Sequence, residues 1–354
     1  MPCLEPTGTR TGNRYQEETE MPIIDMHAHV TPDRFKKAVS ETGSWYGLGP
    51  RTGELHRPGG FNSSTAERLA EMDKVGIDIA LITPNAGFYQ YDNELATTIA
   101  IARECNDSIA EIVVEYPRRF AGLGTLPMQD TPSAITELER AVGDLGLNGV
   151  MVDDHVNGLT WDNPRFLPFF EAAEAIGALI FFHQGGDTCV RARIDRYSLP
   201  NAVGNLTERA LSFAALVFGG VMDKHPNLKV LLGHGGGFAP FGASRMDKVA
   251  GAFESAYPET GLQPPFGRGS RDYVLSKPPS SYLPQFYYDC CVYTAPALRF
   301  LIDAVGIDRV VLGTDAPAPM YLIDAVNWIN ELKCLSPAEK QAILADNATA
   351  LLGL

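Results

Sequence analysis

The chain has 354 residues, of which 45% are hydrophobic, and a mean hydropathy of -0.07, which is enough apolar material for a sizeable buried core. Its net charge of -14 and its strand-sized apolar runs argue against nucleic acid, an anionic membrane surface or a transmembrane helix as part of its biology. Six cysteines without a CxxC or framework spacing predict reduced thiols in a cytoplasmic protein.

The first twenty residues are polar and include Glu17, Glu18 and Glu20. They lack the apolar centre of a signal peptide, so residues 1–20 are predicted to be a disordered N-terminal extension. Residues 21–354 are then expected to form one domain.

After Met21 the sequence alternates between short apolar runs and longer amphipathic segments. Strands are predicted at residues 22–26, 77–83, 120–126, 149–152, 178–182, 229–232, 286–289 and 309–312. Helices are predicted at residues 64–74, 92–116, 131–145, 163–176, 206–224, 238–257, 295–305 and 338–351. A loop-rich insertion is expected at residues 31–62, after the first strand.

Eight strands, each followed by a helix, predict a (β/α)8 TIM barrel. The alternative is an open, doubly wound sheet. That fold is disfavoured because no GxGxxG follows the first strand. It would also separate the first strand from the eighth, and candidate metal ligands lie near both.

Four residues of metal-ligand type lie at the predicted strand ends: His27, His29, His183 and Asp315. His27 and His29 are two residues apart, so on an extended strand they point the same way. Three imidazoles and a carboxylate at the carboxyl ends of barrel strands predict a divalent-metal site and a metal-dependent enzyme. Zinc is favoured because imidazoles outnumber carboxylates, and manganese is also possible.

His234 precedes three glycines, which we interpret as leaving room for a ligand to approach closely. Because imidazole changes protonation state near neutral pH, His234 is predicted to act as a general acid or base. The alternatives are a fifth metal ligand or a cap of the next helix. Asp315 is assigned two compatible tasks, namely binding the metal and orienting His234 while shuttling a proton.

An acidic chain must meet an anionic substrate with local arginines. His56 and Arg57, in the insertion, either bind a substrate carboxylate or are solvated loop residues. Arg245 is expected to point away from its own site, either towards a neighbouring subunit or into a weak surface ion pair. Asp25 and Asp289 are predicted to have structural hydrogen-bonding roles.

Several motifs resemble the decarboxylase branch of the amidohydrolase superfamily, most closely the 2-amino-3-carboxymuconate 6-semialdehyde decarboxylases. They lie at residues 25–29 with Pro32, and at 116–129, 218–222, 225–230, 234–237 and 312–315. The resemblance extends over nearly all of residues 21–354. It implies a barrel with zinc bound by His27, His29, His183 and Asp315 and with His234 as the catalytic histidine.

The resemblance also implies that Arg245 reaches across a homodimer interface to a substrate carboxylate. In the family, a second carboxylate-binding arginine comes from the insertion after the first strand. In this sequence the candidates for that position are Arg57, His56 and Arg51. Residues of the family pattern around the site are replaced by Gln184 and Gly185 after His183, by Ser198 and by Ala316, and these changes remove aromatic walls. The substrate is therefore not assumed to be the aminocarboxymuconate semialdehyde itself.

The resemblance implies a metal-dependent, non-oxidative decarboxylase that acts on a small carboxylated aromatic or muconate-type acid. The alternative is a metal-dependent hydrolase or hydratase, because the ligand set alone does not choose the reaction. In that reaction activated water attacks a carbonyl and Asp315 takes up the proton. A third hypothesis is a non-catalytic metal-binding barrel. No organic or redox cofactor is expected.

Overall fold

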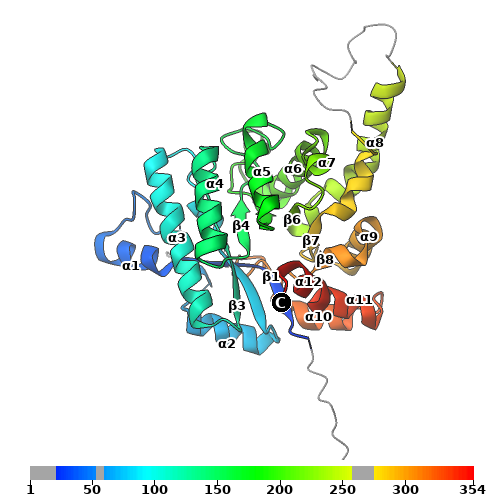
Figure 1. Cartoon of the computed structure of the whole chain (residues 1–354). Coiled ribbons are helices and arrows are strands. Elements are labelled where there is room, and N and C mark those ends of the chain that lie inside the picture. The colour runs from blue at the N-terminus through cyan, green and yellow to red at the C-terminus, as the bar shows by residue number, and fades with distance from the viewer. Residues whose placement is uncertain (1–20, 53–59, 257–274) are drawn as a thin grey trace, which may run out of the picture.

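The computed structural model describes residues 21–52, 60–256 and 275–354, so the predicted extension at residues 1–20 lies outside the described residues. Eight parallel strands follow one another around a barrel in chain order (Figure 1). They are β1 (Ile24–Val30), β2 (Ile79–Pro84), β3 (Phe120–Gly124), β4 (Gly149–Val152), β5 (Leu179–Phe182), β6 (Lys229–Leu232), β7 (Tyr287–Asp289) and β8 (Val310–Val311).

Backbone hydrogen bonds between the two ends of the chain close the barrel. Met26 donates its N–H to the carbonyl of Leu312 at 2.8 Å, and Asp315 donates to the carbonyl of His27 at 2.8 Å. Because these bonds join β1 to the segment after β8, the sheet has no open gap there. The prediction of a (β/α)8 barrel is confirmed, and the doubly wound alternative is wrong.

Helices surround the strands on the outside of the barrel (Figure 1). They are α1 (Asp33–Thr42), α2 (Thr65–Val75), α3 (Leu95–Glu115), α4 (Thr131–Glu139), α5 (Leu167–Ala175), α6 (Leu206–Phe218), α7 (Val221–Lys224), α8 (Ala239–Ala256), α9 (Ala295–Val305), α10 (Ala325–Glu331), α11 (Pro337–Gln341) and α12 (Asn347–Leu352). The predicted start of α2 is confirmed by a capping box between Ser64 and Glu67.

The structure departs from the predicted elements in two places that bear on the site. The insertion after β1 contains a helix, α1, because Phe35 and Val39 are one turn apart and pack into a small second core. Gly43, with φ 81°, ends this helix in a left-handed conformation. In addition, β1 continues to Val30, four residues beyond the predicted end of the strand.

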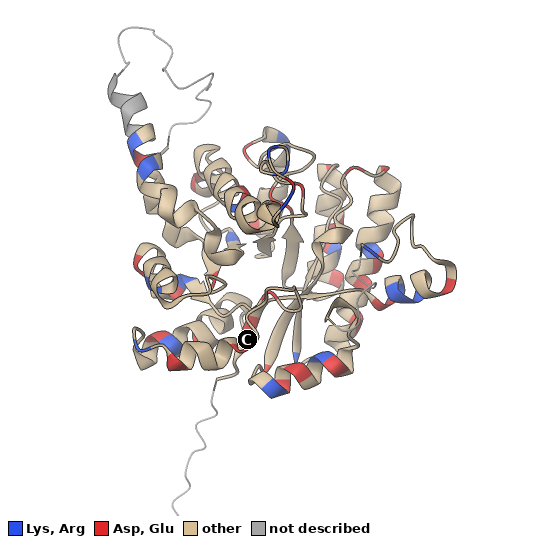
Figure 2. Cartoon of the chain, turned by 180° about the vertical axis from the view of Figure 1, so that it is seen from behind, with Lys and Arg blue, Asp and Glu red and all other residues tan. Residues whose placement is uncertain are grey.

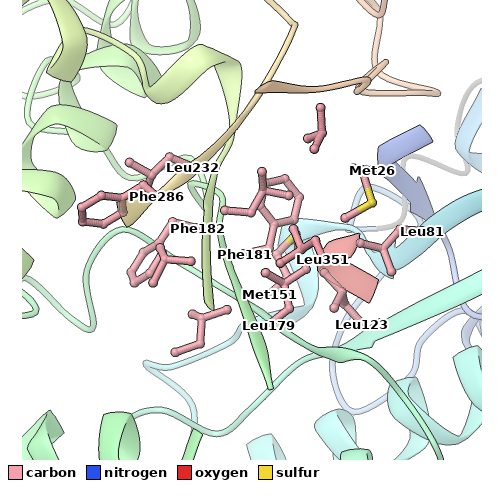
Figure 3. Close-up of a cluster of buried hydrophobic side chains, with 14 of the residues drawn as sticks. Met26, Leu81, Leu123, Met151, Leu179, Phe181, Phe182, Leu232, Phe286 and Leu351 are labelled. Atoms are coloured by element: carbon pink, nitrogen blue, oxygen red, sulfur yellow. The ribbon is translucent and has the colours of Figure 1, made fainter. Parts of the chain in front are cut away.

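Large apolar side chains from the strands and from the elements around them form the buried core (Figure 3). Both faces of the strands are buried, as expected for parallel strands that are covered by helices. Phe181 from β5 packs edge-on against the ring of His27, with 4.8 Å between their centroids. This packing holds the His27 ring firmly at the top of an apolar core.

Charged residues lie mainly on the outer helices and the connecting loops, and few lie on the strands (Figure 2). Within the described residues, no helix is both long and apolar enough to cross a membrane.

Candidate metal centre

Strand β1 carries two of the predicted ligands side by side. His27 and His29 are both buried, and their Nε2 atoms are 3.1 Å apart. Two imidazole nitrogens at this distance either share a proton or bind one cation. The shared direction of the two side chains is confirmed. The predicted end of this strand at Met26 is wrong, because β1 continues to Val30 and carries both histidines, with a change of register between Asp25 and Ala28.

His183, which follows β5, and Asp315, beyond β8, complete the predicted set. Asp315 Oδ1 lies 3.2 Å from His27 Nε2, 3.3 Å from His29 Nε2 and 3.9 Å from His183 Nε2. Closure of the barrel therefore brings all four predicted ligands together. Asp315 has φ 63°, an unusual backbone conformation for a residue other than glycine.

The donor atoms fit a divalent metal. Atoms bound to one ion at about 2.1 Å lie roughly 3–3.5 Å apart, close to the spacings around Asp315 Oδ1. Both ring nitrogens of His183 are buried without a hydrogen-bond partner among the described residues, which is costly unless a cation binds one of them. Ligand atoms of His27, His183, His234 and Asp315 all lie within 4.8 Å of one another, so His234 also borders the site.

His234 lies two residues after the end of β6 and turns its ring towards the same centre. Its Nε2 lies 3.4 Å from Asp315 Oδ2, while its Nδ1 is buried without a partner among the described residues. Its φ of 56° is left-handed, and a backbone hydrogen bond from its N–H to Asp289 Oδ2 at 2.8 Å holds this conformation. The ring is thus placed either to exchange a proton with a bound molecule or to bind the metal.

The three glycines after His234 have a packing role that was not predicted. All three have positive φ values, and a Cβ atom on Gly237 would lie 2.2 Å from the carbonyl oxygen of Leu206. A Cβ on Gly236 would lie 2.6 Å from the ring of Tyr288. The glycines therefore let the turn pack against the protein, and the interpretation that they also leave room for a ligand beside His234 stays a prediction.

Asp289, at the end of β7, organises the residues beneath the centre. Its Oδ2 accepts the Nδ1–H of His27 at 2.7 Å as well as the His234 N–H, and its Oδ1 accepts the N–H groups of Gly235 and Cys291. Burial opposes charge on His27, but Asp315 and Asp289 outweigh it and raise the pKa of His27 to about 10. With Nδ1–H donated to Asp289, His27 presents Nε2 to the centre.

The predicted structural roles of both aspartates are confirmed. Asp25 accepts hydrogen bonds from the N–H and the hydroxyl of Thr314, at 2.9 and 2.6 Å. Gly313 makes room for the neighbouring side chains of Asp289 and His27. A Cβ atom at Gly313 would lie 2.6 Å from Asp289 Cβ and 3.0 Å from His27 Cβ.

We expect Asp289→Asn to lower metal affinity by about 10- to 100-fold, the usual effect of losing such a partner of a ligand. The four groups that contact the Asp289 carboxylate are all N–H donors. Whichever way the asparagine amide is turned, its NH2 group faces an N–H donor and cannot accept the hydrogen bond. Competition with a chromogenic chelator measures the affinity. Asp303→Asn, at an exposed ion pair, is the control. Equal affinities for the two variants would show that Asp289 does not support the ligand.

A cavity of about 490 Å³ opens next to the centre. Arg51, from the insertion after β1, lines it, whereas His56 and Arg57 lie outside the described residues. Arg245 is exposed on α8 and is not among the residues that line the cavity, as expected for a side chain that points away from its own site. Arg191, in the loop after β5, also lines the cavity and was not predicted.

Comparison with known proteins places these residues in a family. The amidohydrolase family matches residues 24–354, nearly the whole described chain. This chain belongs to the amidohydrolase family. A family relative from Dictyostelium discoideum, 2-amino-3-carboxymuconate-6-semialdehyde decarboxylase, is 32% identical over 343 residues, which cover 94% of this chain and 91% of the relative. The resemblance predicted from the sequence motifs is confirmed.

Other members of the family show what the scaffold supports. The crystal structure of a dihydroxybenzoic acid decarboxylase from Polaromonas, with bound manganese and 2-nitroresorcinol, has a TM-score of 0.77 and 26% identity, covering 94% of this chain and 97% of that one. A 2-keto-4-carboxy-3-hexenedioate hydratase from Sphingobium is 26% identical, covering 92% of this chain and 95% of the hydratase. The relatives of this chain therefore include decarboxylases, which is the predicted class of enzyme, and a hydratase.

Proposed function

We propose that this protein is a metal-dependent, non-oxidative decarboxylase of a small carboxylated aromatic or dienoic acid. The observation that carries the proposal is the convergence of His27, His29, His183 and Asp315 beside a ring nitrogen of His234, at the edge of a polar cavity. Decarboxylases among the relatives, from a slime mould and from bacteria, support the same reaction class.

In this proposal the four ligands hold one divalent ion, which would supply Lewis-acid polarisation of a substrate oxygen. His234 delivers a proton to the carbon that bears the carboxylate, and that carbon becomes tetrahedral. The bond to the carboxylate then breaks, CO2 leaves, and the electron pair of that bond restores the conjugated system. One proton replaces one CO2, so no redox cofactor is required.

The metal can be zinc or manganese. The three imidazoles favour zinc, while the manganese in the Polaromonas enzyme supports the alternative. The experiment is to strip the protein with a chelator, reload it with either ion, and measure CO2 release from a panel of carboxylated phenols and muconates. We expect release only from reloaded protein. CO2 release at full rate by the stripped protein would rule out metal dependence.

The second candidate function is hydration, which the Sphingobium relative supports. Here water adds to the substrate and no carbon is lost. Incubation in ¹⁸O-labelled water separates the two reactions by mass spectrometry. Product that gains labelled oxygen without CO2 release identifies a hydratase, and CO2 release with a product that has lost one carbon identifies the decarboxylase.

We also propose a cytoplasmic homodimer in which Arg245 of one subunit reaches the substrate carboxylate of the other. The exposure of Arg245 on α8, away from its own cavity, supports this assignment. Analytical ultracentrifugation should give twice the chain mass. A monomer that retains full activity would exclude a role for Arg245 across an interface.

A further inference from the structure

The three residues that follow β5 are fixed by contacts from neighbouring parts of the barrel. The hydroxyl of Tyr89, from the loop after β2, donates to the carbonyl of His183 at 2.6 Å. Asp153, which follows β4, accepts the N–H of Gly185 through Oδ1 at 2.8 Å. Between these two anchored residues lies Gln184, which is 7% exposed and lines the cavity beside the metal centre. The backbone of Gln184 therefore has little freedom to move.

A buried arginine fixes the side chain of Gln184 as well. Arg209, on α6, is fully buried, and its Nη2 donates to Gln184 Oε1. The Nη1 of Arg209 donates to Asp154 Oδ1 at 2.8 Å, and Ser212 donates its hydroxyl to the same oxygen at 2.7 Å. The guanidinium is thus anchored by a buried carboxylate. Moving it away from Gln184 would leave a buried donor without a partner, which is costly.

This contact decides which way the amide of Gln184 is turned. An arginine side chain has only donors, so it must face the amide oxygen and not the NH2 group. Within the described part of the chain, Gln184 Nε2 has no hydrogen-bond partner, and it is not a fully enclosed atom. Because Gln184 lines the cavity, its NH2 group is available to a molecule bound there.

A second amide of the same cavity shows the contrast. Gln90 also lines the cavity, but its Nε2 donates to the carbonyl of Gly87 at 2.8 Å and its Oε1 accepts from Asn93 at 3.0 Å. Both ends of that amide are used by the protein itself, whereas Gln184 uses only its oxygen. A donor that is oriented before a ligand arrives loses little freedom on binding, so its hydrogen bond favours affinity.

The surroundings of Gln184 favour an uncharged partner for this donor. The positive charge of Arg209 is balanced by the buried carboxylate of Asp154, so the pair adds no net charge beside the amide. A neutral NH2 group can donate to an oxygen but cannot accept from an amine.

We propose that Gln184 is a specificity-determining residue that donates a hydrogen bond to an uncharged oxygen of the substrate. This oxygen belongs to a ketone or ether group, separate from the carboxylate that is released. An amine in the same position is disfavoured, because two donors would face each other. The assignment deepens the proposed decarboxylase function and rests on it only for the identity of the released carboxylate.

The test compares acetylbenzoates with isopropenylbenzoates, which have nearly the same shape but lack the carbonyl oxygen. Ligand-observed NMR titrations of the full-length, metal-loaded protein give the ratio of the two affinities for the ortho, meta and para isomers. For at least one isomer, we expect the acetyl compound to bind about fivefold more tightly, as one net hydrogen bond allows. Gln184→Glu should remove or reverse this preference, because a carboxylate oxygen then faces the carbonyl oxygen while Arg209 keeps an acceptor.

Asn201→Asp is the matched control for charge. Asn201 is exposed and lines the same cavity, so this variant adds the same negative charge and leaves the donor of Gln184 in place. We expect it to keep the wild-type ratio of affinities. Gln184→Leu should lose the preference without reversing it, because leucine neither donates nor accepts a hydrogen bond.

The proposal is overturned if no acetyl compound binds the wild-type protein more tightly than its isopropenyl counterpart, or if Gln184→Glu keeps the wild-type ratio. It is also overturned if Asn201→Asp changes the ratio as much as Gln184→Glu does, since the effect would then come from charge alone. None of these probes has to react. A lack of CO2 release would therefore count against the proposed function and leave the result on Gln184 standing.

Discussion

Replacing His234 by glutamine should lower kcat for decarboxylation by about 10²- to 10⁴-fold, the usual contribution of a positioned acid or base. Glutamine keeps a polar side chain of similar length but cannot exchange a proton. Nε2 of His234 lies 3.4 Å from Asp315 Oδ2, and its buried Nδ1 has no hydrogen-bond partner among the described residues, which is a suitable arrangement for proton transfer to a bound molecule. CO2 release under substrate saturation measures the effect.

Metal content decides between the two possible roles of His234. As a proton carrier, His234→Gln retains one bound metal per chain, measured by plasma emission spectrometry after dialysis. As a ligand, it loses the metal together with the activity. His225→Gln is the matched control, because His225 pairs with Glu174 at 3.0 Å outside the candidate site. Unchanged kcat with metal retained would remove His234 from the mechanism.

Asp154→Ala should destabilise the fold by about 3–5 kcal/mol, because it leaves a buried cation without its partner. Arg209 is fully buried and donates from Nη1 to Asp154 Oδ1 at 2.8 Å, and Ser212 donates its hydroxyl to the same oxygen at 2.7 Å. Arg209 also donates to the side chain of Gln184, which lines the cavity. We therefore expect Asp154→Ala to unfold at a lower urea concentration than the wild-type protein and also to bind ligand more weakly.

Two further variants show whether the loss of stability arises because the pair of Asp154 and Arg209 is buried. Asp303→Ala removes the carboxylate of an exposed pair with Arg299, and should cost at most about 1 kcal/mol. The double change Asp154→Leu with Arg209→Met removes both buried charges and should be less harmful than Asp154→Ala alone. Urea unfolding followed by circular dichroism gives each free energy. If Asp154→Ala were no worse than Asp303→Ala, the buried pair would not stabilise this fold.

Local patterns in the sequence predicted most of the secondary structure. The predicted bounds of β4, β6 and α9 agree with the structure, at Gly149–Val152, Lys229–Leu232 and Ala295–Val305. The two strands are short continuous apolar runs and the helix has an amphipathic period, so each has a recognisable start and end in the sequence. α1 was missed because its ten residues lie among many glycines and its apolar face covers a second core. Its signals were Pro32 before the first turn, the Phe35 and Val39 spacing, and Gly43 after the last.

The sequence by itself determined the barrel, the residue types of the metal centre and the family, since each depends on local pattern or short motifs. Only the tertiary structure decided that His27 meets Asp289, that the glycines after His234 serve packing, and that Arg191 lines the cavity. The signal for Arg191 was present as three arginines within residues 191–196. Which of them lines the cavity depends on contacts between distant parts of the chain, and no local pattern records such contacts.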